Sequence, residues 1–256
     1  MPAPRTRTLL AMGVTLVAAI AAAVLAVLLT RSQPPAKVAL PLHRVGQITL
    51  PGDNSRFDYA SLDARRGLLF IAHLGASEVI EVNIHTGHIV RTIAGLPDVH
   101  GVLVVPQLRR VYATATGSNA MATVDEDTGQ VLTRTPTGDY PDGLAYDPSR
   151  KAVWVTNETG GSETVVDAAT GVVRGTVRLG GEAGNVAYDP VTDQILVDVQ
   201  TRNTLAVINP ATLAITRHLA LAGCDHDHGL TLDHTNRLAF IACDGNATLL
   251  SLDMHT

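Results

Sequence analysis

Charged side chains are scarce in this sequence. Only 17% of its 256 residues are Asp, Glu, Lys or Arg, and the formal net charge is −5. The 19 Lys and Arg residues form no cluster, so the basic patch that attracts a nucleic-acid backbone is missing. We therefore expect no nucleic-acid partner.

Familiar catalytic motifs are missing as well. The sequence contains no GxSxG nucleophile motif, no recognisable Ser-His-Asp pattern and no glycine-rich phosphate loop, and each of these would have indicated a specific class of enzyme. The sequence therefore gives no direct evidence for an enzyme, and no catalytic residue is assigned.

Charge is also missing from one long segment near the N-terminus. Residues 9–30 are uncharged and rich in Ala, Val and Leu, and Arg5 and Arg7 precede them. A helix of this length spans roughly 30 Å, the thickness of the bilayer core. We expect residues 1–8 to be cytoplasmic, 9–30 to be a single-pass membrane anchor and 31–41 to be a spacer, with the rest outside the cytoplasm. The alternative is a signal cleaved near Ala36, which would make the protein periplasmic or secreted.

The rest of the chain contains a repeat. A Thr recurs in the same turn context every 42 residues, and then once more after 44: Thr86, Thr128, Thr170, Thr212 and Thr256. This spacing divides residues 42–256 into a leading segment and the repeats 57–98, 99–140, 141–182, 183–226 and an incomplete 227–256. A fixed period of this size is typical of repeat architectures.

One repeat predicts four short strands. The runs "HGVLVV" (100–105), "RVYATA" (110–115), "AMATVD" (120–125) and "QVLTRTP" (130–136) are apolar or alternating. Four strands per unit of 40–45 residues indicate an all-β fold, a β-propeller with five recognisable blades.

The turns between the third and fourth strands have a chemical signature. An Asn or Asp side chain opens each turn and can accept hydrogen bonds from backbone N–H groups ahead of it: Asn83, Asp125, Asp167, Asn209 and Asp253. Glycines close three of the turns, at positions that favour positive φ: Gly87, Gly129 and Gly171.

The two ends of the repeat region bear on closure of the propeller. "LHRVGQITL" (42–50) matches the fourth strands of the repeats, and the fifth repeat stops before its own fourth strand. Residues 42–50 are therefore expected to form a lone outer strand. Two alternatives remain: five blades that close into a ring, or an incomplete seven-bladed propeller, which we favour.

Several stretches resemble a known family. "FDYASLDARRGLLFIAHLG", "DGLAYDPSRKAVWVTNETGG" and "GCDHDHGLTLDHTNRLAFIACDGN" are similar to the bacterial YVTN-type β-propellers, in particular the extracytoplasmic YncE-like proteins. The resemblance covers residues 43–256. It implies an exported propeller with seven blades, but no particular activity, because propellers host unrelated functions.

Two columns of the repeat are expected at one mouth of the channel, because antiparallel strands bring the start of the first strand next to the end of the second. Polar residues in these columns and in the "CDHDH" insertion form the predicted ligand site: His73, His100, Asp142, Asn157, His226 and His228. The favoured function is a non-enzymatic binding or scaffold protein, whose partner is an unidentified protein or small molecule.

A divalent metal is the alternative use of the same residues. Imidazoles and carboxylates bind zinc, copper or iron, so His100, His226, His228 and Asp142 form the candidate ligand set of a metal-dependent enzyme, a lactonase-like hydrolase or an oxidoreductase. Against this stands a hydrated polar rim whose side chains only cap strand ends, and no cofactor is assigned.

The sequence has only two cysteines, Cys224 and Cys243. They fall at the same end of one predicted hairpin, in a chain expected to reach an oxidising compartment. We favour a disulfide between them over two unpaired thiols.

Overall fold

The computed structural model describes residues 42–255, which fall into two units divided between Gly46 and Gln47. The predicted cytoplasmic segment, anchor and spacer (1–41) and Thr256 lie outside the described residues. No helix within residues 42–255 is long and apolar enough to cross a bilayer.

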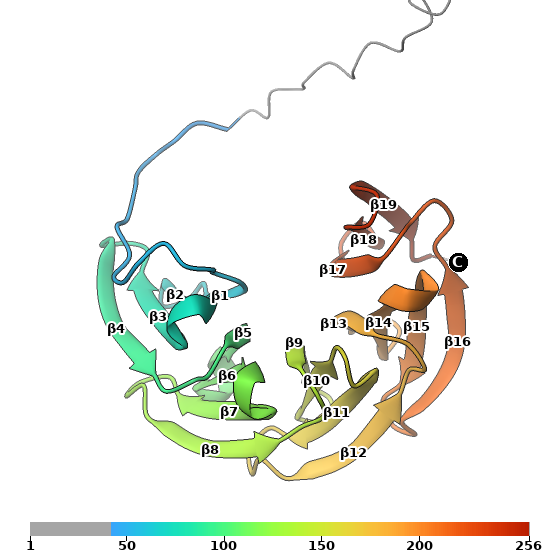
Figure 1. Cartoon of the computed structure of the whole chain (residues 1–256), viewed down its shortest axis with the longest axis horizontal. Helices are drawn as coiled ribbons and strands as arrows, with labels where there is room; N and C mark the ends of the chain where they lie inside the picture. The colour runs from blue at the N-terminus through green and yellow to red at the C-terminus, as the bar shows by residue number, and fades with distance from the viewer. Residues whose placement is uncertain (1–41, 256) are drawn as a thin grey trace, which may run out of the picture. The chain divides into compact units, whose positions relative to one another are not determined.

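The second unit is built from five antiparallel sheets, which we call blades 1 to 5 (Figure 1). Blade 1 contains β1 (Ala60–Asp63), β2 (Leu68–His73), β3 (Glu78–Asn83) and β4 (His88–Ala94). Blade 2 contains β5 (Val99–Val105), β6 (Arg110–Ala115), β7 (Ala120–Asp125) and β8 (Val131–Pro136). Blade 3 contains β9 (Pro141–Asp147), β10 (Ala152–Asn157), β11 (Ser162–Asp167) and β12 (Val173–Arg178). Blade 4 contains β13 (Ala183–Asp189), β14 (Gln194–Val199), β15 (Thr204–Asn209) and β16 (Ala214–Ala220). Blade 5 contains β17 (Asp227–Asp233), β18 (Leu238–Cys243) and β19 (Thr248–Asp253).

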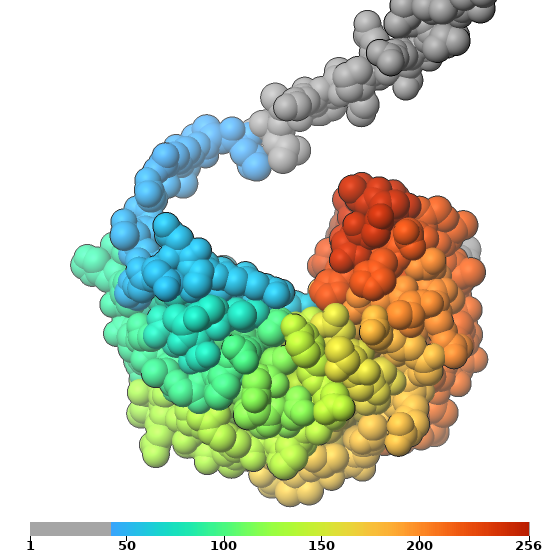
Figure 2. Space-filling model, in the orientation of Figure 1, coloured from blue at the N-terminus to red at the C-terminus, as the bar shows by residue number. Residues whose placement is uncertain are grey.

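Each blade is a meander, because its strands pair in chain order. The blades follow one another along an arc, with the first strand of each toward the centre and the fourth strand outside (Figure 1). Neighbouring blades pack tightly along the arc in the space-filling view (Figure 2). The predicted all-β propeller of five blades, the last of which lacks a fourth strand, is confirmed.

Burial explains why the strands of a blade differ. All but the first residue of β6 are buried, whereas most of β8 is half-buried or exposed. The second strand packs between neighbouring blades and reads as a continuous apolar run, while the outer strand alternates and faces solvent. The apolar cores lie between successive blades, and Trp154, Tyr112 and Phe70 are their largest fully buried side chains.

The predicted Asx turns are present. The side chain of Asp167 accepts hydrogen bonds from the N–H groups of Ala169 (3.0 Å) and Thr170 (2.8 Å). Asn83, Asp125 and Asn209 accept the equivalent pairs of bonds. Gly87, Gly129 and Gly171 adopt φ of 71°, 73° and 73°, which glycine tolerates without a steric penalty.

A β-bulge recurs near the start of the innermost strand in blades 2 to 5. In blade 2, Val99 pairs with Ala115 and Val102 with Ala113, so His100 and Gly101 lie opposite Thr114 alone. A bulge bends the strand and redirects a side chain. Equivalent residues near the start of the innermost strand are therefore redirected in each of these blades.

One sequence prediction is wrong. Residues 42–59 contain no strand, although 42–50 were expected to form the lone outer strand. An alternating pattern provides a surface suited to a sheet, but a strand also needs a neighbouring edge to pair with. Residues 42–50 join the ladder of none of the five sheets.

Candidate functional site

The centre of the candidate site is Asp142, the second residue of β9, which lies in the bulge of blade 3. Its side chain is buried, with 2% of its surface exposed. Its Oδ2 atom accepts a hydrogen bond from the Tyr59 hydroxyl at 3.3 Å and lies 3.8 Å from Nε2 of His228. Its Oδ1 atom has no hydrogen-bond partner within the part of the chain that the structure describes.

Tyr59 connects this carboxyl group to a further blade. It lies just before β1, and its hydroxyl also contacts Oδ1 of Asn185, which occupies the bulge of blade 4. Residues of blades 1, 3, 4 and 5 thus meet around one point.

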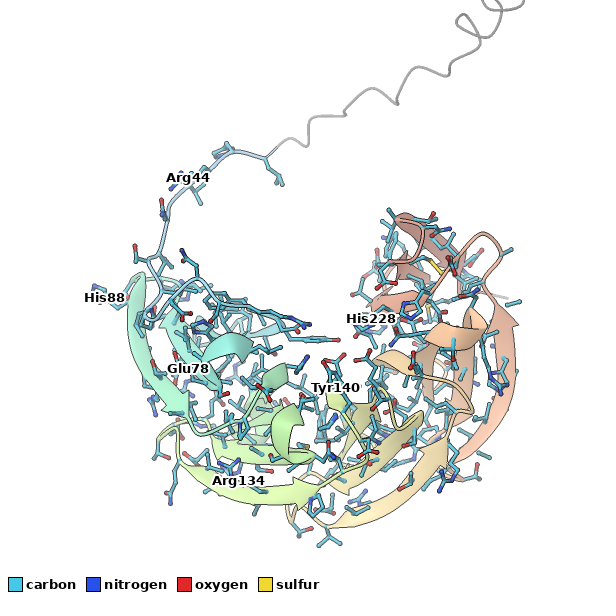
Figure 3. All side chains as sticks on the ribbon, viewed as in Figure 1. Arg44, Glu78, His88, Arg134, Tyr140 and His228 are labelled. Carbon is cyan, nitrogen blue, oxygen red and sulfur yellow. A yellow bond between two sulfur atoms is a disulfide. The ribbon has the colours of Figure 1, made fainter. Side chains whose placement is uncertain are left out.

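His100 occupies the bulge of blade 2, and its ring is held on both sides. Nδ1 lies 2.8 Å from the carbonyl oxygen of Asp98, and Nε2 lies 3.1 Å from the Tyr140 hydroxyl. A carbonyl oxygen only accepts, so Nδ1 carries a hydrogen and donates it to Asp98. Tyr140 and His228 both lie toward the centre of the arc, whereas His88 and Arg134 lie on its outer side (Figure 3). We call Tyr59, His100, Asp142, Tyr140, Asn185 and His228 the opening cluster.

The opening cluster lies in an acidic environment. Burial raises the pKa of Asp142 to about 6, although the nearby His100 and His228 act in the opposite direction. Burial, followed by the negative charges of Asp142 and Asp58, raises the pKa of Tyr59 well above its usual value. Near neutral pH the tyrosine is therefore a hydrogen-bond donor and the aspartate is largely a carboxylate.

Three of the six predicted ligand residues meet here, and three do not. His100, Asp142 and His228 belong to the opening cluster. Asn157 is fully buried, donates to Ser162 and Thr164, and accepts from Gly138 N–H, so it holds loops together. His226 lies near the surface, with Nδ1 2.6 Å from Asp244.

His73, the remaining predicted residue, belongs to a separate arrangement in blade 1. Its ring is fully buried and stacks on Phe57 at 4.1 Å. Ser55 Oγ lies 3.0 Å from its Nε2 and Glu78 Oε1 lies 3.4 Å from its Nδ1, a Ser-His-acid set that the sequence did not reveal. Ser55 donates its only hydroxyl hydrogen to Asp53, so His73 does not receive it as a base would. Together these contacts hold the segment 53–55 against the buried His73 at the end of β2.

The candidate metal ligands do not form one centre. Within residues 42–255, no group of three or more His, Cys, Asp or Glu side chains is arranged to hold a metal ion. His226, which was placed in that set with His100, His228 and Asp142, binds Asp244 instead.

The predicted ligand set left out three members of the opening cluster: Tyr59, Tyr140 and Asn185. Tyr59 follows Asp58 and Asn185 follows Gly184, and both of these positions are equivalent in the repeat to that of His100. Tyr140 lies two residues before Asp142. Tyrosine beside a polar mouth position was the available signal. That these residues touch depends on contacts between blades, which the repeat alone does not specify.

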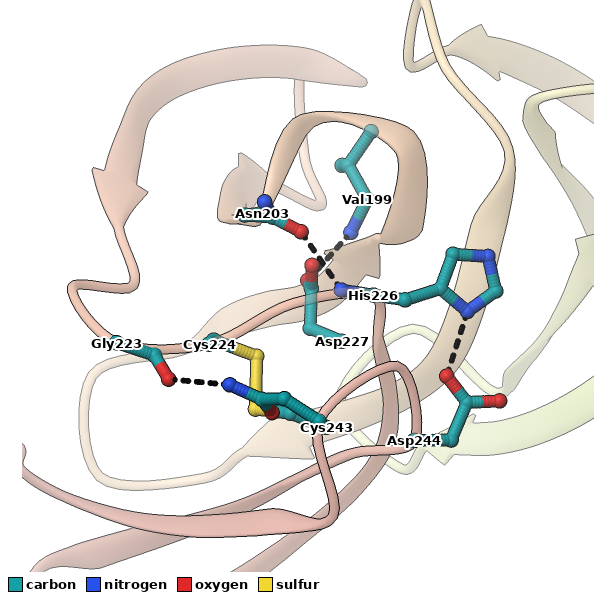
Figure 4. Close-up of a disulfide and its surroundings, with 9 residues drawn as sticks. Val199, Asn203, Gly223, Cys224, His226, Asp227, Cys243 and Asp244 are labelled. Carbon is teal, nitrogen blue, oxygen red and sulfur yellow. Dashed lines mark hydrogen bonds and ion pairs between the residues drawn. A yellow bond between two sulfur atoms is a disulfide. The ribbon is translucent and has the colours of Figure 1, made fainter.

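The two cysteines lie beside the insertion in blade 5 (Figure 4). Cys224 and Cys243 form a disulfide, with their Cα atoms 5.4 Å apart. Asn246, close to Cys243 in sequence, donates a hydrogen bond to the Gly223 carbonyl at 2.9 Å. The disulfide therefore ties the segment that enters β17 to the end of β18.

The cavities lie between blades. One of about 390 Å³ is lined by Trp154, Arg150, Arg174 and Leu213 between blades 3 and 4. Another of about 340 Å³ is lined by Arg65, Arg66 and Arg109 between blades 1 and 2. The arginines of both are largely paired with carboxylates, as Arg150 is with Asp193 and Arg66 with Glu126. We therefore place the candidate site at the opening cluster, where a buried acceptor has no partner.

Comparisons with known proteins identify the fold alone. No family model and no curated protein sequence matches the chain. Solved β-propeller structures do match: a hydrazine synthase of Kuenenia stuttgartiensis (TM-score 0.63, 14% identity, 76% of each chain covered) and a streptogramin B lyase (TM-score 0.62, 13% identity, 78% of this chain and 69% of the other). A chain in a structure of the mitotic checkpoint complex also matches (TM-score 0.72, 15% identity, 81% of this chain and 64% of the other).

Proposed function

We propose that the chain is a binding protein whose ligand enters the centre of the propeller and contacts the opening cluster. The observation that carries this proposal is Asp142, a nearly fully buried carboxyl group with one oxygen bonded to Tyr59 and the other without a partner among the described residues. A buried polar atom without a partner is costly, and a ligand that donates a hydrogen bond removes that cost.

The charges favour a ligand with a positive group. Besides burial, the negative charges of Asp142, Asp58 and Glu158 raise the pKa of Tyr59. Arg56 is bound to Asp58 at 2.9 Å. The His100 ring is hydrogen-bonded to the Asp98 carbonyl and the Tyr140 hydroxyl rather than to Asp142. An ammonium group donates three hydrogen bonds and would neutralise Asp142. A small primary amine therefore fits better than a carboxylate of the same size.

The test uses probes with the same carbon skeleton. We expect n-butylamine, but not butanoate, to shift the NMR signals of the His100 and His228 rings in the full-length chain. Asp142→Asn should weaken amine binding at least tenfold, about 1.4 kcal/mol. Asp244→Asn, which removes an exposed carboxylate bound to His226, should leave it unchanged. Equal binding of the amine to the Asp142→Asn variant, or preferential binding of butanoate, would overturn the proposal.

The alternative is a metal-dependent enzyme at the same opening, and elemental analysis distinguishes it. Stoichiometric metal in the purified chain that is lost on replacing both His100 and His228 by Ala would favour the enzyme.

We further propose that residues 9–30 anchor the propeller outside the cytoplasm, with signal cleavage near Ala36 as the alternative. Support comes from the uncharged segment, from Arg5 and Arg7 before it, and from the resemblance to extracytoplasmic YVTN-type propellers, whose seven-bladed ring stays a prediction for this chain. Membrane fractionation with intact mass measurement tests this. Full-length protein in the membrane fraction supports an anchor, a mature chain starting near Ala36 supports cleavage, and full-length protein in the cytoplasm contradicts both.

A further inference from the structure

Two buried carboxyl groups meet at the junction of blades 4 and 5. Asp198 lies on β14 and Asp227 begins β17, and neither side chain is exposed to solvent. Oδ2 of Asp227 accepts a hydrogen bond from the N–H of Val199, the neighbour of Asp198, at 3.0 Å (Figure 4). Asp227 thereby contacts the backbone of the strand that carries Asp198, directly after that residue.

The other blades show that this pair is specific to one junction. At the repeat position of Asp198, opposite the bulge, stand Ala72, Thr114, Thr156 and Ala242. The position of Asp227 is held by apolar residues, Val99, Pro141 and Ala183, in blades 2 to 4.

Thr114 shows how the position works in blade 2. Its hydroxyl accepts from Gly101 N–H at 2.7 Å and donates to the carbonyl oxygen of Asp142 in the next blade at 2.8 Å. An ionised aspartate at the same place has no hydrogen to give to that carbonyl.

Several acceptors at the junction lack a partner. Both carboxyl oxygens of Asp198 and Oδ1 of Asp227 have no hydrogen-bond partner within residues 42–255. Gly184 locates two more oxygens, because a Cβ atom there would lie 2.8 Å from the carbonyl oxygen of His228, 3.0 Å from that of Asp227 and 2.9 Å from Cβ of Asp198. Two backbone carbonyl oxygens and the Asp198 side chain therefore converge on Gly184.

Two buried carboxylates require a positive charge nearby. The nearest cationic candidates are the imidazoles of His226 and His228, which are bonded or adjacent to Asp244 and Asp142. A shared proton is the simplest alternative, but one proton forms one hydrogen bond and leaves the remaining acceptors unpaired. A cation can bind several of these oxygens at once.

We propose that Asp198 and Asp227 bind a calcium ion between blades 4 and 5. Calcium takes six to eight oxygen ligands, among them carboxylates and backbone carbonyls, and both kinds of group are present at this junction. Two carboxylates neutralise its charge. The centre predicted from the sequence consisted of His100, His226, His228 and Asp142, whereas this site has two aspartates as its side-chain ligands. The ion would hold blade 5 against blade 4.

The test is thermal unfolding of the full-length chain in excess CaCl₂ and in EDTA. We expect calcium to raise Tm by roughly 5 °C or more. Asp198→Thr should remove this shift yet still fold, because Thr occupies the same position in blades 2 and 3. Asp225→Asn, which changes an exposed carboxylate two residues before Asp227, should keep it. Calorimetric titration of the wild-type chain should show one calcium site.

Two results would overturn the proposal. If calcium leaves Tm unchanged and Asp198→Thr is as stable as the wild type or more so, the pair shares a proton instead. If Asp198→Thr retains the full calcium shift, the ion binds elsewhere in the molecule.

Discussion

The guanidinium group of Arg237 in blade 5 donates two hydrogen bonds, of 2.8 and 2.9 Å, to the carboxylate of Asp189 in blade 4. Both side chains are largely buried, with 11% and 1% of their surfaces exposed. A bidentate pair of this kind fixes both distance and orientation. It therefore sets the position of the last blade relative to its neighbour, on the side of the propeller away from the opening cluster.

Removal of Arg237 should destabilise the protein strongly. Arg237→Ala leaves a buried carboxylate without its partner, which costs about 3–5 kcal/mol. Arg237→Lys, which keeps the charge but loses the second hydrogen bond, should cost less. Urea unfolding measures both, with Arg217→Ala as an exposed arginine control in the same pair of blades. Equal stability of the Ala variant and the control would show that the pair does not hold the blades.

The same pair predicts a loss of stability in acid. Burial raises the pKa of Asp189, but the hydrogen bonds from Arg237, Thr192 and Val191 outweigh it and lower the folded-state pKa to about 2 from 3.8. The stabilisation is therefore complete above the unfolded pKa and is lost as pH falls through the folded value. The acid-induced loss should be smaller in Arg237→Ala than in the wild type.

Glu163 should have the opposite dependence on pH. Burial raises its pKa to about 8, although the Thr156 hydroxyl that bonds it acts in the other direction. Its folded-state pKa is above the unfolded value of 4.5, so the folded state binds its proton more tightly and stability falls as pH rises from about 5 to about 8.

Glu163→Gln should reduce this loss, by roughly 3–5 kcal/mol at the alkaline end. Unfolding curves at the two pH values measure the difference, and Glu182→Gln on an exposed turn is the control. A variant whose stability changes with pH as much as the wild type does would assign the effect to other groups.

A side chain at Gly101 should displace the backbone of Asp142 and so disrupt the opening cluster. A Cβ atom there would lie 2.1 Å from the carbonyl oxygen of Asp142 and 2.9 Å from Thr114 Oγ1. The backbone of blade 3 cannot yield without separating from blade 2, so Gly101→Ala should cost at least about 3 kcal/mol. Gly46→Ala, whose Cβ meets nothing within 4 Å, is the control for the loss of glycine itself. Unchanged stability of Gly101→Ala would contradict this packing.

The disulfide should stabilise blade 5, whose β19 has no outer neighbour in the described sheets. It closes a loop with a sequence separation of 19, for which the chain-entropy estimate is roughly 3 kcal/mol. Replacing Cys224 and Cys243 together by Ala should lower the free energy of unfolding by about that amount. Mass spectrometry of the alkylated, non-reduced chain checks the bond itself, and two alkylated cysteines would disprove it.

The sequence revealed what each repeat determines locally. Asx turns such as the one at Asp167, and the buried second strands, depend on residues within one blade, so period and polarity predict them. Asp142, His100 and His228 were found because they recur in one column. The hydrogen bond from Tyr59 to Asp142 joins residues 83 positions apart in the sequence, and the contact of Tyr59 with Asn185 joins residues 126 apart. A periodic pattern does not predict contacts over such separations. The prediction of a strand at residues 42–50 failed for a related reason, because an alternating pattern does not identify the sheet edge with which a strand would pair.

The recurring bulge has an evolutionary consequence. It is a backbone feature, and in each of blades 2 to 5 one residue of the bulge belongs to the opening cluster: His100, Asp142, Asn185 and His228. Substitutions at these positions alter the chemistry of the centre without disturbing the cores between blades. Duplication of a blade thus supplies a new, independently variable position, and a binding specificity can diversify one repeat at a time on an unchanged scaffold.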